Sequence, residues 1–233
     1  DSFLISYFRE KMGNKPSLTL ELDSHTADAG VNTRIEAFVD IIDMYLKIKP
    51  KDYTGTFTPA ELKFINKQIY FIDSSGKKHH VKEEKVKIII PSMNTLSTEA
   101  LSATFRGIGF NTEALPGNDF NSLKLGRKNS SCKECLPLIL TVGGFLSYLE
   151  KRVENDELLI LFMPTASGNC RFGQYNIFVN KLIRKNRIKN VAMLSLTPEN
   201  GYAGIGTRNT INVLKSIITA DEMDNIKNSL RVL

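Results

Sequence analysis

The sequence has no apolar run long enough to cross a bilayer, which takes about 20 consecutive residues, and the printed 233 residues contain none. The opening stretch, DSFLISYFREKMG, has neither a basic lead nor a small-residue cleavage site, so we expect no secretory signal peptide. These two absences predict a protein that does not span a membrane.

Cysteine and histidine are also scarce, with three residues of each. Three cysteines are too few and too unevenly placed for the disulfide framework of a small secreted domain, and such thiols suit the reducing cytosol. We therefore expect a cytoplasmic protein. The histidines do not fall into a Ser/His/Asp pattern, which argues against a catalytic triad.

The charge is basic but dispersed, with a net charge of +6 and a sequence pI of 9.1. The local clusters are KKHH at residues 77–80, expected to be an exposed hairpin end, and IRKNRIK at 183–189, typical of the solvated end of an amphipathic helix. No nucleic-acid recognition motif accompanies them, so we do not expect a nucleic-acid partner. The 42% of hydrophobic and 24% of charged residues are ordinary for a globular protein.

Both ends of the chain lie within helical patterns, whereas natural termini are usually polar and loosely ordered. We therefore expect an internal segment of a longer protein, with partner surfaces and further metal ligands outside it. Within the segment we expect three parts. Residues 1–48 are the end of one α/β lobe, residues 49–85 a connector with a β-hairpin, and residues 86–233 a second α/β lobe that carries the cysteines.

The first two parts contain four predicted elements. The pattern predicts a helix that ends at Gly13 and a strand over SLTLELD. It also predicts a helix capped at Asn32 or Thr33, with Thr33 and Glu36 in the spacing of a capping box. Two short alternating runs around SSGK predict the hairpin.

The third part alternates apolar strands with helices. KVKIIIPS, LLILFMPT and VAMLSLTPE are the predicted strands, and helical patterns follow each of them, two of these after the last strand. Uninterrupted apolar strands alternating with helices predict an α/β fold with a parallel sheet covered on both faces. Because crossovers are right-handed, the loops PSMNT, PTASGNCRFGQ and TPENGYAGIG should leave one edge of that sheet, where such folds bind ligands.

The cysteines are the strongest candidates for chemistry. We expect Cys135 and Cys170 each to begin a helix at that edge, where backbone amides and the helix dipole stabilise a thiolate. Two such thiolates can ligate a soft metal or an iron–sulfur cluster. The spacing leaves two alternatives open: the cysteines are small buried hydrophobic residues, or Cys132 and Cys135 form a C-x-x-C redox dithiol.

Other motifs are weaker. Asp23, Ser24, His25 and Asp28 resemble a hard-metal or acid–base cluster, but such a string more often makes a polar turn. Arg34 lies near a predicted helix start. Its functional interpretation is that it binds an anion, and its structural interpretation is that it takes part in capping or in surface pairing. NGYAGIGT resembles a phosphate-binding loop without the Lys-Ser/Thr ending of a P-loop. Basic residues beside the cysteines suit an anionic group: Arg127, Lys128, Lys133 and Arg171.

Several strings resemble one protein family. SSCKECLPLILTVGGFLSYLE, MPTASGNCRFGQYN and LTPENGYAGIG, together with the opening DSFLISYFREKMGNKPSLTLELDSHTADAGVNTRIEAF, are similar to the long CoA-substrate-specific enzyme activases, activators of 2-hydroxyacyl-CoA dehydratases. The resemblance covers most of the chain and is weakest over residues 49–85. It implies a segment that follows the ATPase domain of the same polypeptide and has lobes like those of a dehydratase subunit.

The resemblance also implies a cofactor and partners. Cys135 and Cys170 match the family cysteines that ligate an iron–sulfur cluster in an electron-transfer region, and a [4Fe-4S] cluster is the expected type. The cluster is expected in the full-length protein, and the segment alone need not retain it. Cys132 stands where the family usually has another residue, and it is a further candidate ligand. The implied partners are the ATPase domain, a dehydratase and a CoA-ester substrate. The segment itself has no nucleotide-binding motif, so it is not expected to hydrolyse ATP.

Overall fold

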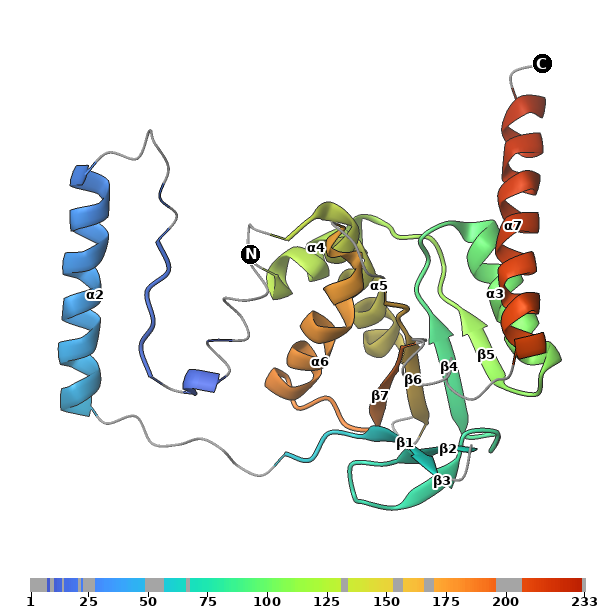
Figure 1. Cartoon of the computed structure of the whole chain (residues 1–233), viewed down its shortest axis with the longest axis horizontal. Coiled ribbons are helices and arrows are strands. Elements are labelled where there is room, and N and C mark those ends of the chain that lie inside the picture. Colours follow the sequence, from blue (N-terminus) through green and yellow to red (C-terminus); the bar gives the residue numbers. More distant parts are fainter. Residues whose placement is uncertain are drawn as a thin grey trace. The chain divides into compact units, whose positions relative to one another are not determined.

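A computed structural model of the chain describes residues 8, 11–13, 15–20, 22, 28–48, 57–65, 68–130, 134–152, 157–165, 170–195 and 207–231 (Figure 1). The chain divides into two compact units, residues 1–56 and residues 57–233. The boundary falls inside the range 49–85 that was expected to be a connector, so the hairpin belongs to the second unit. Among the described helices, none combines the length and apolar character that a bilayer crossing requires.

The first unit contains the helix α2, Asp28–Ile48. Helical residues at Phe8, Lys11 and Met12 lead to Gly13, whose φ of 62° suits glycine, so the predicted helix end is confirmed there. The predicted strand over SLTLELD is wrong where it is described, because residues 16–20 form no strand. Alternation alone does not make a strand when the described part of the unit offers no partner to pair with.

The predicted start of α2 is also wrong. The helix begins at Asp28, so Thr33 lies inside it and donates its hydroxyl hydrogen to the carbonyl of Ala29, 2.9 Å away. A threonine inside a helix commonly satisfies its hydroxyl in this way, and it is then not a cap. Arg34 consequently lies beyond the first turn, away from the amides that would hold an anion.

The second unit is built on a parallel sheet, as predicted, and this sheet has four strands where the sequence predicted three. Its strands are β4 (Val86–Ile90), β5 (Asn111–Ala114), β6 (Leu158–Phe162) and β7 (Val191–Leu194), in the order β5-β4-β6-β7. Every residue of β6 is buried, as expected for a central strand with helices on both faces. The polar edge strand β5, Asn-Thr-Glu-Ala, was not predicted.

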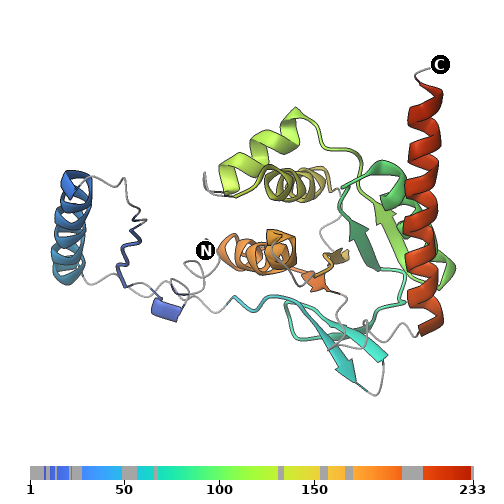
Figure 2. The ribbon, with the colours of Figure 1, turned by 45° about the horizontal axis from the view of Figure 1, so that its top comes forward.

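Helices cover both faces of this sheet (Figures 1 and 2). One face carries α3 (Thr95–Gly107) and α7 (Thr207–Leu230), whose Phe105 and Val213 share a core cluster with Ile88 and Ile160. The other carries α4 (Phe120–Asn129), α5 (Leu136–Lys151), the 3-10 turn η1 (Arg171–Gln174) and α6 (Tyr175–Lys185). The single helix α7 replaces the two helical patterns predicted at the end of the chain.

A small antiparallel sheet packs onto the same core. It contains β1 (Glu61–Ile65), β2 (Gln68–Ile72) and β3 (Lys78–His80), and the predicted hairpin is the β2–β3 pair. Asp73 shapes the turn by accepting hydrogen bonds from the amides of Ser75 and Lys77, both at 2.9 Å. The expectation that KKHH is exposed is wrong for His79, which is 4% exposed and has its Nε2 3.0 Å from Asp73.

Candidate functional site

The carboxyl ends of the parallel strands meet at one edge of the sheet, and the chain places Cys170 after one of them. The strand β6 ends at Phe162, and Cys170 is the N-cap of η1, which leads directly into α6. The side chain of Cys170 is exposed. The prediction that this cysteine begins a helical segment beyond a strand end is therefore confirmed.

Cys135 begins the helix α5, also as predicted. It is the N-cap residue, with an extended backbone conformation, and Pro137 stands in the first turn. Proline suits that position because its missing N–H would have no helical partner. The thiol makes no capping hydrogen bond and is half-buried. Instead, its Sγ lies 2.9 Å from the Oη of Tyr175.

Tyr175 joins the two cysteines into one site. It is the first residue of α6, is 3% exposed and has its ring 5.3 Å from that of Phe172. Burial raises the pKa of the phenol above its ordinary value of 10.0, and the hydrogen bond with Cys135 and the charges of the Cys135 and Cys170 thiolates add to this rise. The phenol therefore stays protonated at neutral pH, and it donates its hydrogen whenever Cys135 is a thiolate.

The donor chemistry of this site suits a soft metal, because thiolates prefer such ions. The described residues supply two thiols: Cys135, in contact with the Tyr175 phenol, and Cys170, which caps the turn that leads to it. Among the described residues, no group of three or more His, Cys, Asp or Glu side chains could hold a metal ion. The third cysteine, Cys132, lies outside the described residues, so the structure does not test its role.

The other predicted motifs do not join this site in the described structure. The strings around His25 and NGYAGIG lie outside the described residues, as does Lys133. Arg127 and Lys128 are exposed in the last turn of α4, where cations suit the helix dipole. Of the alternatives that were left open, burial of both cysteines does not fit, because neither side chain is fully buried.

Sequence reasoning missed Tyr175 and a second polar cluster. Tyr175 stands in the string CRFGQYN, five residues after Cys170, so its place at a helix start was an available signal. The second cluster surrounds Lys87 in β4, whose Nζ lies 2.8 Å from Glu157 and 3.2 Å from Glu113. Burial alone would lower the pKa of Lys87, but the hydrogen bonds and charges of these carboxylates outweigh it and raise the pKa.

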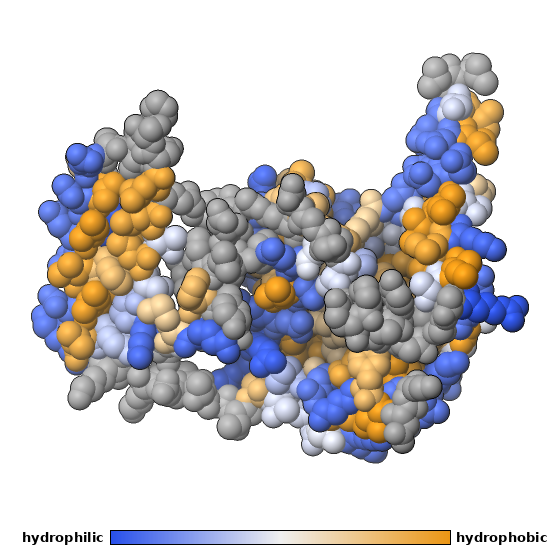
Figure 3. Space-filling model, in the orientation of Figure 1, coloured by the Kyte–Doolittle hydropathy of each residue, from blue (hydrophilic) through white to orange (hydrophobic). Residues whose placement is uncertain are grey.

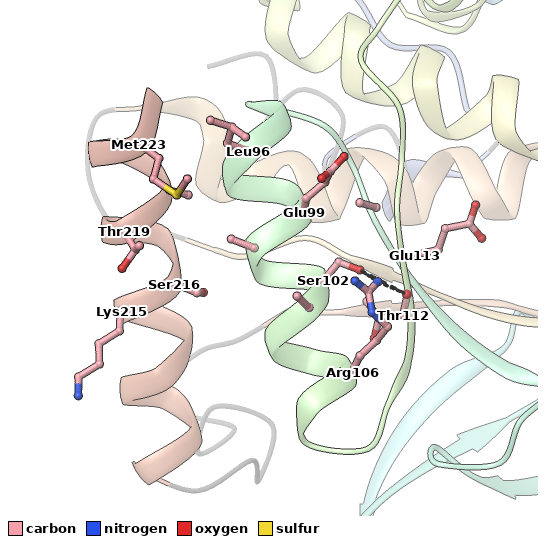
Figure 4. A pocket seen from close by; sticks show the side chains of 14 residues that line it. Leu96, Glu99, Ser102, Arg106, Thr112, Glu113, Lys215, Ser216, Thr219 and Met223 are labelled. Carbon is pink, nitrogen blue, oxygen red and sulfur yellow. Dashed lines mark hydrogen bonds between the residues drawn. The ribbon is translucent and has the colours of Figure 1, made fainter. Parts of the chain in front are cut away.

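A large open cavity lies between α3, β5 and α7 (Figure 4). Its volume is about 810 Å³. At its base, the guanidinium of Arg106 donates to the Thr112 carbonyl at 3.1 Å and to the Ser102 hydroxyl at 2.7 Å. The arginine thereby satisfies a carbonyl of the edge strand β5, so its position has a structural explanation without a ligand.

Comparison with protein-family models, with curated proteins and with solved structures finds no match for this chain. The family resemblance of the cysteine-bearing strings therefore stays a prediction. The fold and the geometry around Tyr175 are the observations on which a functional proposal rests.

Proposed function

We propose that this chain is an electron-transfer region of a CoA-substrate-specific enzyme activase-like protein, in which Cys135 and Cys170 bind an iron–sulfur cluster. The observation that carries the proposal is the arrangement of these two thiols about Tyr175. Cys135 contacts the phenol directly, at 2.9 Å, and Cys170 caps the turn that leads into the helix beginning with that phenol.

The position of the thiols supports ligation. Each stands at an N-cap without making a side-chain capping bond, so neither sulfur is engaged by the start of its own helix or turn. Amide groups at the starts of α5 and η1 lie beside those sulfurs, and hydrogen bonds from such groups tune a cluster's reduction potential. A cluster of the proposed kind needs further ligands, and Cys132 is the candidate that the sequence offers.

Residues of this chain would hold the iron–sulfur cluster and shape its surroundings. A bound cluster supplies one-electron redox chemistry. Cys135 and Cys170 would supply thiolates, and the protonated Tyr175 hydroxyl would donate to the Cys135 sulfur from the protein side. The ring of Phe172 makes an edge-to-face contact with the ring of Tyr175 and helps to hold the phenol in place.

Anaerobic reconstitution of the chain with ferrous iron and sulfide tests this proposal. We expect bound iron and sulfide, with charge-transfer absorbance in the visible spectrum, and we expect both to be lost in Cys135→Ala and in Cys170→Ala. Cys132→Ala tests the further candidate ligand: loss of iron in this variant would assign Cys132 to the cluster, and retained iron would place the further ligands elsewhere. Equal iron in the parent chain and in the Cys135→Ala, Cys170→Ala double variant, with unchanged circular dichroism, would contradict the ligand role.

A non-catalytic docking module is the second candidate, and exposed apolar side chains favour it. Figure 3 shows apolar side chains at the surface of α2, and the exposed large apolar residues of this helix are Ile35, Val39, Ile41, Met44 and Leu46. Surfaces of this kind commonly contact another protein. Absence of iron in the full-length protein after anaerobic reconstitution would favour this candidate over the first.

A further inference from the structure

The strand order of the parallel sheet creates a switch point between β4 and β6. From β4 the chain passes through α3 to β5 on one side, and it later returns to β6 on the other side of β4. The helices that follow these two neighbouring strands, α3 and α6, lie on opposite faces of the sheet (Figure 1). In open α/β sheets, the loops diverge at such a point and leave a crevice where ligands bind.

A cavity of about 370 Å³ lies at this switch point. The ends of both strands line it, through Ile90 and Pro91 after β4 and through Phe162 and Pro164 at β6. Helix α3 contributes Leu101, and α7 closes the cavity with Val213 and Ile217. This volume falls in the range of small-molecule sites, about 300–1,000 Å³.

The lining selects against charged ligands. None of the described residues that line this cavity is charged, and most of them are apolar. The side chain of Asn94 is already committed, because it accepts from the Ser97 amide at 3.1 Å and donates to Asp224 at 3.0 Å. Burying an ion against apolar walls without a partner is costly, and the carboxylate of Asp224 also repels an anion.

One polar group of the lining remains available. The hydroxyl of Ser97 makes no hydrogen bond within the part of the chain that the structure describes, whereas the neighbouring Thr98 hydroxyl donates to the Asn94 carbonyl at 2.7 Å. A ligand that reaches Ser97 could therefore add one hydrogen bond to its apolar contacts. Ile217, which is 39% exposed, marks an accessible rim of the cavity.

We propose that this switch-point cavity binds a small, neutral, largely apolar molecule with one hydroxyl or carbonyl group that pairs with Ser97. The site is separate from the thiols, since neither cysteine lines it. The proposal therefore does not depend on an iron–sulfur cluster, and the site adds a ligand-binding activity to the proposed electron transfer.

Methyl-selective NMR of the isotope-labelled chain tests the site, with 1-octanol as the neutral probe and octanoate as its charged counterpart. We expect 1-octanol to cause saturable shifts in the methyl signals of Ile90, Leu101 and Val213, and octanoate to bind at least about tenfold more weakly. No saturable shift up to the solubility limit of the alcohol would overturn the site. Equal affinity for the two probes would overturn its selectivity for neutral ligands.

Two neighbouring substitutions on α7 provide the matched test. Ile217→Trp places a large ring at the cavity rim and should abolish the shifts, whereas Ile218→Trp adds the same ring at a 63% exposed position that does not line the cavity. Both changes are at solvent-accessible positions, so both variants should keep the amide spectrum of the folded chain. Equal loss of binding in the two variants would overturn the proposal, and so would unchanged binding in Ile217→Trp. The Cys135→Ala variant should bind 1-octanol as the parent chain does.

Discussion

The helices α4 and α5 pack closely because two glycines leave room for the neighbouring backbone. This packing provides the sharpest prediction, since a side chain at either glycine would clash. A Cβ atom added at Gly143 would lie 1.7 Å from the carbonyl oxygen of Ser122, and one at Gly126 would lie 1.9 Å from that of Ile139. Both obstacles are backbone atoms, which cannot rotate away as a side chain can. To reach the 3.4 Å of ordinary contact in Gly143→Ala, the helices must separate by roughly 1.7 Å.

Separating the helices destabilises the fold by more than the higher helix propensity of alanine stabilises it. Overpacking of a well-packed core costs about 1–3 kcal/mol and occasionally more, and the clash with backbone places Gly143→Ala at or above the upper end. Alanine in place of a helical glycine stabilises the helix by about 1 kcal/mol. We therefore expect Gly143→Ala to lower the free energy of unfolding by about 2 kcal/mol or more.

Urea unfolding followed by circular dichroism measures this loss. The control is Gly107→Ala in the last turn of α3, where an added Cβ meets no atom within 4 Å. This variant should stay within about 1 kcal/mol of the parent chain. If Gly143→Ala proves as stable as Gly107→Ala, the close approach of α4 and α5 is wrong. Because Cys135 begins α5, the same variant should also change the rate at which that thiol is alkylated.

Two further predictions concern pH. The raised pKa of Tyr175 means that the folded chain holds the phenol proton more tightly than the unfolded chain does, so stability should be lost as the pH rises above 10.0. In urea unfolding at several pH values, Tyr175→Phe should remove this part of the alkaline loss. Identical profiles of stability against pH in the parent chain and the variant would contradict the prediction. For Asp73, burial raises the pKa, but hydrogen bonds from Ser75, His79 and Lys77 outweigh it and hold the pKa below its ordinary value of 3.8. Its contribution to stability should therefore be lost as the pH falls below 3.8, and Asp73→Asn should be less stable at neutral pH with a flatter acid profile.

The central part of the fold was predictable because its strands are apolar on both faces. Val86–Ile90 and Leu158–Phe162 are runs that only a sheet with two covered faces can bury, and their alternation with helices indicated parallel pairing. The edge strand β5 was not predicted, because it lacks such an apolar run. Its sequence, Asn-Thr-Glu-Ala, places one buried side chain against the core, so its pairing with β4 leaves almost no apolar pattern to detect.

The candidate site was predictable only in part. Pro137 indicated a helix start after Cys135, and the structure confirms it. The contact between Cys135 and Tyr175 was not predictable, because these residues are 40 positions apart and meet only because α5 and α6 lie on the same face of the sheet. The burial of His79 has the same origin, since its position depends on the core beneath the hairpin.

Both margins of the parallel sheet are occupied by other parts of the chain. At β5, Ser102 and Arg106 of α3 take up the Thr112 carbonyl. At the opposite margin, β1 lies beside β7, and Ser74 and Asn190 exchange two hydrogen bonds, of 3.3 Å and 2.9 Å, between the hairpin turn and the residue before β7. Uncovered strand margins are templates for pairing between molecules. The contacts at both margins should therefore hinder the strand-upon-strand pairing of this sheet with other copies of itself.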